Sequence, residues 1–175
     1  DCDTGVFGDN CYGIAYGDAA DMMGNVRAGQ FNTFEKEELG WLNDGISPPI
    51  LTVASSGRYS IEPYSASTVG PKALKIPRGT DGSGNQRWYY VEYRQPIGGD
   101  SVLDDLGNLT KGVMVRIATE DNPDSSFQLD MTPGSSTKFA EMADGALGVG
   151  QTYYEESAGA KITLVSTSST EAAID

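Results

Sequence analysis

The cysteine residues near the start of the chain are the first candidates for chemistry. Cys2 and Cys11 are the only two cysteines, and the sequence contains no histidine. Two thiols without a histidine or a third cysteine make a poor zinc site, whereas a closed loop of about ten residues suits a disulfide worth about 2–3 kcal/mol. We therefore expect a disulfide rather than free thiols, and with it an oxidising, extracellular or periplasmic setting.

Acidic residues in the same segment suggest a second kind of chemistry, calcium binding. Asp1, Asp3 and Asp9 lie beside Gly5 and Gly8, as carboxylates and glycines do in a calcium loop. The spacing lacks the third acidic position and the glutamate at position twelve that an EF-hand requires. A solvated acidic loop is the ordinary interpretation, and a calcium site at these three aspartates is the alternative.

A second acidic turn contains Asp100, Asp104, Asp105 and Asn108, and we interpret it as a solvated surface loop. Asn108 also begins the triplet Asn-Leu-Thr, a glycosylation sequon that matters only in a source that glycosylates proteins.

Glu92 and Arg94 share one face of a strand, where a partly exposed ion pair at the strand end is the ordinary expectation.

Several enzyme classes are excluded by what the sequence lacks. Ser-His-Asp and Cys-His catalysis need a histidine base, and no glycine-rich phosphate loop with a lysine is present.

The 12 Lys and Arg against 25 Asp and Glu give a net charge of −13, which repels nucleic acids and anionic lipid surfaces. We predict no nucleic-acid partner and no membrane partner.

The elements that must position these residues are mainly β. Asn32 can cap a helix that runs on to Leu42, with Glu35 completing a capping box and the aromatic residues Phe34 and Trp41 packed inward. Seven or eight short β-type runs follow, separated by Gly, Pro, Ser and Asp. We place these strands at residues 50–54, 58–63, 73–76, 87–95, 113–119, 126–131, 161–166 and 171–174.

The fold class that this pattern predicts is an antiparallel β-sandwich preceded by a disulfide-stapled loop and one short helix. The 87–95 run is apolar or aromatic on both faces near its centre, so we expect a central strand. The last two runs are expected to form a hairpin. Residues 1–47 form the first unit and residues 48–175 the sandwich. The absence of a leader and the start at Asp1 lead us to expect a mature product or a fragment.

Motifs in a fixed order along nearly the whole chain indicate a family. Tyr16-Gly17-Asp18, then Asp21-Met22-Met23-Gly24, then Leu39-Gly40-Trp41 come first. The later motifs are at residues 59–63, 72–76, 89–94, 112–115 and 129–133. In this order the sequence resembles the gametolysin-type metallopeptidases, a metzincin-like group of secreted zinc enzymes.

The resemblance implies a Met-turn at Met23, whose thioether would lie beneath a catalytic zinc ion without binding it. It also implies that Cys2 and Cys11 are the cysteines that the family has between its last zinc ligand and the Met-turn. Ordinary core packing is the alternative role for Met22 and Met23. In this family the zinc ligands are the histidines of an H-E-x-x-H-x-x-G-x-x-H helix, which would precede Asp1. The chain itself has no zinc ligand set, so we expect it to be inactive alone.

Two hypotheses follow. In the first, the chain is the C-terminal portion of a secreted zinc endopeptidase, with zinc held by an upstream or companion catalytic segment and Met23 at an open concave edge. In the second, it is a non-catalytic extracellular β-domain, acting as a binding module or as a self-associating surface subunit through an exposed groove or sheet edge.

Overall fold

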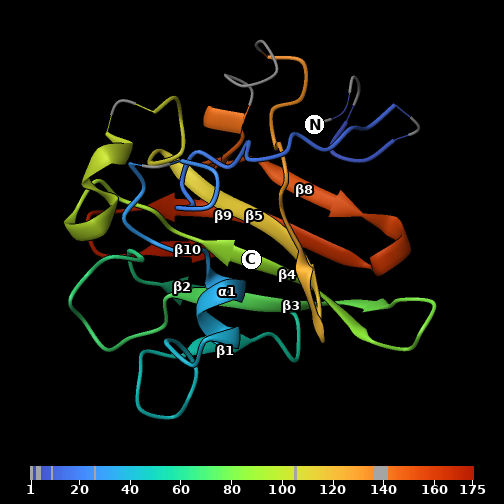
Figure 1. Ribbon diagram of the computed structural model, residues 1–175, viewed down its shortest axis with the longest axis horizontal. Coiled ribbons are helices and arrows are strands. Elements are labelled where there is room, and N and C mark those ends of the chain that lie inside the picture. Colours follow the sequence, from blue (N-terminus) through green and yellow to red (C-terminus); the bar gives the residue numbers. More distant parts are fainter. Residues whose placement is uncertain (1, 3–4, 9, 26, 105, 136–141) are drawn as a thin grey trace.

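The described residues form two packed β-sheets, with the short helix α1 on the outer face of the larger sheet (Figure 1). A computed structural model describes residues 2, 5–8, 10–25, 27–104, 106–135 and 142–175. The larger sheet contains β1 (Ile50–Thr52), β3 (Ala73–Thr80), β4 (Gln86–Glu92), β5 (Gly112–Thr119), β6 (Asn122–Gln128) and β7 (Leu147–Gly148). The smaller sheet contains β2 (Tyr59–Ile61), β8 (Thr152–Glu155), β9 (Ala160–Thr167) and β10 (Ala172–Ile174).

Strand order places β4 at the centre of the larger sheet. The order is β1-β3-β4-β5-β6, with β7 paired to β5, and the smaller sheet has the order β2-β10-β9-β8. All neighbours are antiparallel except β1 and β3, which are parallel. The described residues also include two short 3-10 helices, Gly98–Leu103 and Glu156–Ala158.

The main core lies between the two sheets. Leu74, Val91 and Val115 of the larger sheet are buried against Ile162 and Leu164 of the smaller one. These side chains alternate along their strands, as expected when one face of each sheet is buried. The interface between the sheets is therefore the principal source of hydrophobic stabilisation.

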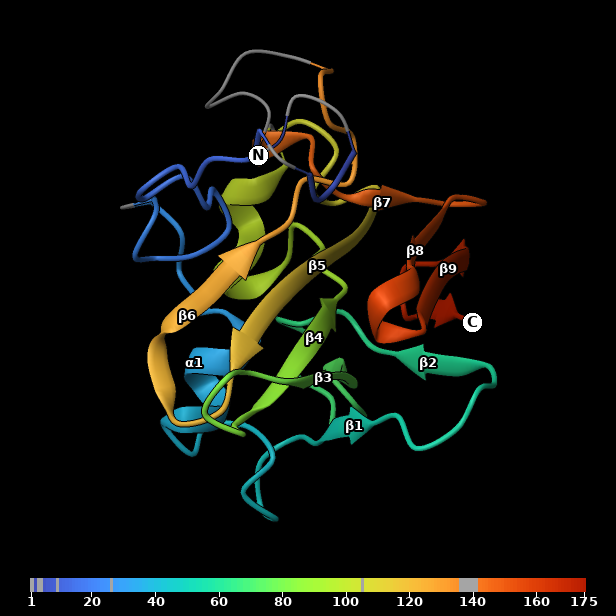
Figure 2. The same ribbon diagram turned by 90° about the vertical axis from the view of Figure 1, so that its right-hand side faces the viewer.

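A second layer covers the other face of the larger sheet. Helix α1 (Thr33–Glu38) buries Phe34 against Tyr90 of β4, with their ring centroids 5.9 Å apart. Glu37 accepts hydrogen bonds from Tyr90 (2.7 Å) and from Lys75 of β3 (2.9 Å), which fix the helix on the sheet. Figure 2 shows α1 and the smaller sheet on opposite sides of the larger sheet, so that β4 is covered on both faces.

The predicted fold class is confirmed, with two sheets, one short α-helix and the Cys2–Cys11 disulfide. The central position of β4 and the final hairpin β9–β10 are also confirmed. The inward packing predicted for Trp41 is wrong, since its side chain is 54% exposed and contacts Phe31, whereas Leu42 is buried. No helix in the described parts of the chain has the length and apolar character needed to cross a membrane.

Candidate functional site

The segment from Tyr16 to Gly24 is a tight turn built by two aspartates. Oδ1 of Asp18 accepts a hydrogen bond from the backbone N–H of Ala20 (2.9 Å). Asp21 Oδ1 accepts from the N–H of Met23 (2.7 Å), and its Oδ2 accepts from the N–H of Asn32 (2.7 Å). Asx turns of this kind fix the backbone locally, so the aspartates of the sequence motif are the residues that shape the turn.

The motif glycines have a steric role in the same turn. A β-carbon on Gly24 would overlap the carbonyl oxygen of Asp18, and one on Gly17 would lie 2.7 Å from Cγ2 of Ile14.

The third motif glycine, Gly40, follows the end of helix α1 and has a φ of +67°. The N–H of Trp41 donates to the carbonyl of Lys36 (2.7 Å). A left-handed residue of this kind commonly ends a helix.

Beneath the turn lies a fully buried cluster of charged side chains. Glu92 of β4 accepts hydrogen bonds from Arg94 Nη1 (3.1 Å), Arg116 Nε (3.1 Å) and the backbone N–H of Thr33 (2.7 Å). Arg116 of β5 also pairs with Asp18 through Nη1. The cluster therefore connects the turn, the helix start and the two central strands.

Arg94 extends this cluster towards the 3-10 helix after β4. Its Nη2 lies 2.8 Å from Asp100 Oδ1 and donates to the carbonyl of Ala20 (2.7 Å). Its guanidinium carbon lies 4.2 Å from the ring centroid of Tyr64. Asp100 also accepts from the hydroxyl of Ser65 (2.8 Å).

Two expectations from the sequence are corrected by this cluster. Glu92 and Arg94 are completely buried rather than partly exposed, because α1 and the turn cover the end of β4. Asp100 is buried as the partner of Arg94 rather than solvated in a surface loop, although Asp104 in the same turn is exposed.

The buried pairs alter the ionisation of their members. Burial opposes the charge of Glu92, but Arg116 and Arg94 outweigh this effect and lower its pKa to about 2. Burial raises the pKa of Asp100 above its usual value despite the attraction of Arg94. Glu92 is thus the fixed negative charge at the centre of the cluster.

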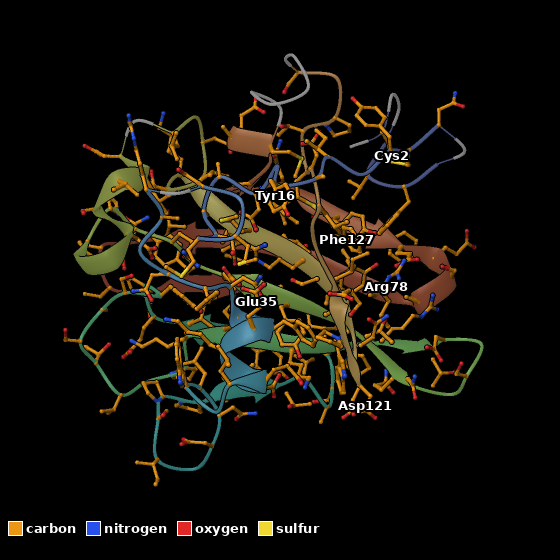
Figure 3. All side chains as sticks on the ribbon, in the orientation of Figure 1. Cys2, Tyr16, Glu35, Arg78, Asp121 and Phe127 are labelled. Atoms are coloured by element: carbon orange, nitrogen blue, oxygen red, sulfur yellow. A yellow bond between two sulfur atoms is a disulfide. The ribbon has the colours of Figure 1, made fainter. Side chains whose placement is uncertain are left out.

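A cavity of about 390 Å³ opens on the other side of the turn. It lies between the disulfide loop, the turn, the first helical turn of α1 and strands β5 and β6. Its walls include Tyr16, Met23 and Phe127, which are all largely exposed, and its acidic lining residues are Asp18, Asp21 and Glu35. Figure 3 shows Tyr16, Glu35 and Phe127 around this region.

Met23 lies at the open concave edge that the first hypothesis requires. Its side chain is 58% exposed and lines the cavity, and Met22 beside it is also exposed. Neither methionine fills the core, so the alternative role in ordinary core packing does not describe them.

Glu35 is the lining residue with the most altered ionisation. Burial and the nearby charge of Asp21 raise its pKa to about 7, while Arg116 acts in the opposite direction. Asn32 caps α1 as predicted, since its Oδ1 accepts from the N–H of Glu35 (3.1 Å). Asp21, rather than Glu35, receives the N–H of Asn32, so the predicted capping box is only half formed.

The other predicted site residues are spread over the molecule. Cys2 and Cys11 form the predicted disulfide at the cavity rim. Asp1, Asp3 and Asp9 lie outside the described residues, so calcium binding there stays a prediction. The side-chain amide of Asn108 exchanges two hydrogen bonds with the backbone of Ala146 (2.9 and 3.2 Å), which a glycan on Asn108 would have to replace.

The buried cluster and the role of Glu35 were missed from the sequence. The signal that could have revealed them is the presence of Glu92 at the end of β4, Arg94 two residues later and Arg116 within β5, beside runs of apolar and aromatic residues. Comparisons with protein-family models, with curated proteins and with solved structures found no match.

Proposed function

We propose that this chain is the C-terminal portion of a secreted, gametolysin-like zinc endopeptidase, in which it supplies the Met-turn and the β-domain that supports it. The observation that carries the proposal is the turn itself. Gly17, Asp18, Asp21 and Gly24 each have a steric or hydrogen-bonding role in it, and it presents Met23 to an open cavity. An exposed methionine on a braced turn is suited to form an apolar floor beneath a metal site contributed by another segment.

The buried charges support the proposal by making the turn rigid. Asp18 pairs with Arg116, and Asp21 joins the turn to the helix start at Asn32. Glu92 receives both Arg116 and the N–H of Thr33. A site built on restrained elements of this kind holds its geometry better than one on a free loop.

The described residues do not by themselves fit a zinc ion. They contain no group of three or more His, Cys, Asp or Glu side chains that could hold a metal, and a catalytic zinc needs three protein ligands and an open position. In the proposal the zinc ligands and the general base belong to a histidine-bearing upstream or companion segment. The chain alone is then inactive as a peptidase.

Intact mass measurement and N-terminal sequencing of the native material test this proposal. The expected result is a longer chain, or a tightly bound companion, that carries H-E-x-x-H-x-x-G-x-x-H, with one zinc ion and peptidase activity that a chelator removes. A native protein without such a segment would overturn it. So would stoichiometric zinc bound by residues 1–175 alone.

The second candidate function is a non-catalytic extracellular β-domain that binds a partner or associates with itself. The exposed apolar side chains at the cavity mouth, Tyr16, Met23 and Phe127, favour it, and β6 beside them is an outer strand of the larger sheet. Sedimentation of the isolated chain from micromolar to millimolar concentration tests self-association. A specific dimer that Phe127→Ser abolishes is expected, and a monomer throughout would remove the self-associating version.

A further inference from the structure

A second cavity lies within the smaller sheet, between strand β9 and the segment that precedes β2. Its volume is about 860 Å³, and it shares no lining residue with the cavity beside Met23. One side of it is formed by β9, and the facing side by residues 55–59. Ile174 and Asp175, at the end of β10, close one end of it. Because β10 runs between β2 and β9, this cavity continues the line of β10.

Strand β9 directs backbone hydrogen-bonding groups towards this cavity. Thr163 exchanges two backbone hydrogen bonds with Asp175 (2.8 and 3.0 Å), whereas the N–H of Leu164 donates on the β8 side, to the carbonyl of Gln151 (3.2 Å). Since these directions alternate along a strand, the N–H and C=O of Lys161 point to the same side as those of Thr163. No described residue bonds to them there, so one donor and one acceptor are open to an added strand.

The floor of the cavity is apolar and belongs to the core between the two sheets. Leu74 and Ile76 of β3 line it, and so does Val53, which follows β1. Leu74 is buried, whereas Ile76 and Val53 pack against the core but are only partly buried. Ile174 of β10 already points into this core, so a strand in line with β10 would place every second side chain on the same floor.

The charged residues on the rim leave one positive charge without an ion-pair partner. Arg58 forms an exposed bidentate pair with Asp175 (2.8 and 2.7 Å). Lys161 is the third charged lining residue; it is exposed and forms no ion pair with a described side chain. Its field reaches Asp175, but both carboxylate oxygens of Asp175 are bound to Arg58. Lys161 therefore favours an acidic side chain beside it.

We propose that this cavity binds an extended segment of a partner protein, which adds to the smaller sheet in line with β10. Continuing the antiparallel pairing of Asp175 with Thr163 places three residues of the segment opposite Ile162, Lys161 and Ala160 in turn. The first and third side chains face the apolar floor, and the second lies on the outer face beside Lys161. The segment is therefore apolar-acidic-apolar in sequence.

Titration of residues 1–175 with the blocked peptide acetyl-Val-Glu-Val-Ser-amide tests the proposal. Main-chain hydrogen bonds supply much of the affinity when a strand is added to a sheet. Amide hydrogen exchange, followed by NMR, is therefore expected to slow at Lys161 when the peptide binds, and the signals of Val53 and Ile76 are expected to shift. A peptide whose glutamate is N-methylated lacks the N–H that faces the carbonyl of Lys161, and it is expected to bind at least about tenfold more weakly.

The charge preference at Lys161 is tested with a second peptide, acetyl-Val-Lys-Val-Ser-amide. It is expected to bind about fivefold more weakly than the glutamate peptide, as for an exposed ion pair. Lys161→Gln is expected to remove this preference, whereas Lys111→Gln, at an exposed lysine outside the cavity, leaves it unchanged. Both titrations are made at about 0.15 M salt, where the distant charges of this acidic chain are screened.

Several results would overturn the proposal. They are unchanged exchange at Lys161 with millimolar peptide, equal affinity for the N-methylated peptide, and a charge preference that survives Lys161→Gln. Protection of the Lys161 amide that rises with protein concentration in the absence of peptide would identify a second copy of the chain as the occupant, against a separate partner. A native chain that fills the cavity with residues after Asp175 would also overturn it. The titrations contain neither zinc nor a companion segment, so their result is separate from that of the peptidase proposal.

Discussion

Replacement of Glu92 by glutamine isolates the energetic role of the buried charge cluster. The variant keeps an acceptor for the backbone N–H of Thr33 but removes the negative charge that Arg94 and Arg116 share. Breaking a buried ion pair by removing one partner costs about 3–5 kcal/mol, because a buried charge is left uncompensated. The same pairs lower the pKa of Glu92 from 4.5 to about 2, a change of the same sign and of the order of 3 kcal/mol. We expect the free energy of unfolding to fall by about 3–5 kcal/mol.

Urea unfolding at pH 7 with the disulfide intact measures this loss. Glu38→Gln removes the same charge from an exposed position of α1 and is the matched control, with an expected change within about 0.5 kcal/mol. The double variant Glu92→Gln/Arg116→Gln should lose less than the sum of the two single variants, because the side chains contact each other.

The pH dependence gives a second check with a defined sign. Since the folded-state pKa of Glu92 lies below 4.5, its ionisation stabilises the fold above that pH, and the stabilisation is lost as the pH falls towards 2. The difference between wild type and Glu92→Gln should fall by about half at pH 3. A loss below about 1 kcal/mol at pH 7, or a difference that does not change with pH, would refute the reasoning.

Three further predictions concern the turn and the cavity. Gly24→Ala should lower the free energy of unfolding by about 2 kcal/mol or more, because the added β-carbon would overlap the backbone of Asp18. Gly13→Ala is the control and should change the free energy of unfolding little, since the space around Gly13 is open. Thermal unfolding compares the two variants. Glu35→Gln should stabilise the fold by about 1 kcal/mol at pH 8 and leave it unchanged at pH 4. Burial raises the pKa of Glu35 to about 7, so ionisation of this side chain costs stability as the pH rises from 4.5 to 7, and solvent screening at the partly exposed site limits the cost. Urea unfolding at both pH values tests this prediction. Reduction of Cys2–Cys11 should cost about 2–3 kcal/mol in urea unfolding, and no change would contradict the loop-entropy argument.

The strands were largely predictable because their apolar residues alternate. The run around Tyr89 and Val91 is apolar on both faces, and this pattern correctly indicated a central strand. Strand β8 was missed, since it is short and only Tyr153 of its residues is buried. The parallel pairing of β1 with β3 was also missed, because strand direction depends on the path of residues 53–72 rather than on local composition.

The candidate site was less predictable than the sheets. The family resemblance drew attention to Asp21 and Met23 in the sequence. The hydrogen bond from the N–H of Met23 to Oδ1 of Asp21, however, forms only in the folded turn. A charged residue in a strand usually indicates an exposed face, and that rule failed for Arg116 because a third layer covers the sheet. Only the tertiary arrangement showed which carboxylate, Glu35 or Asp21, receives the N–H of Asn32 at the helix start.

The ion pair between Asp18 and Arg116 has a consequence for the order of folding. The two residues are 98 positions apart in the chain. During synthesis on the ribosome, the turn that contains Asp18 is therefore made long before Arg116, which neutralises it. Closing so long a loop costs entropy before any contact repays it. The turn around Met23 should therefore become ordered late, after β4 and β5 have paired, and its appearance would report that the larger sheet is complete.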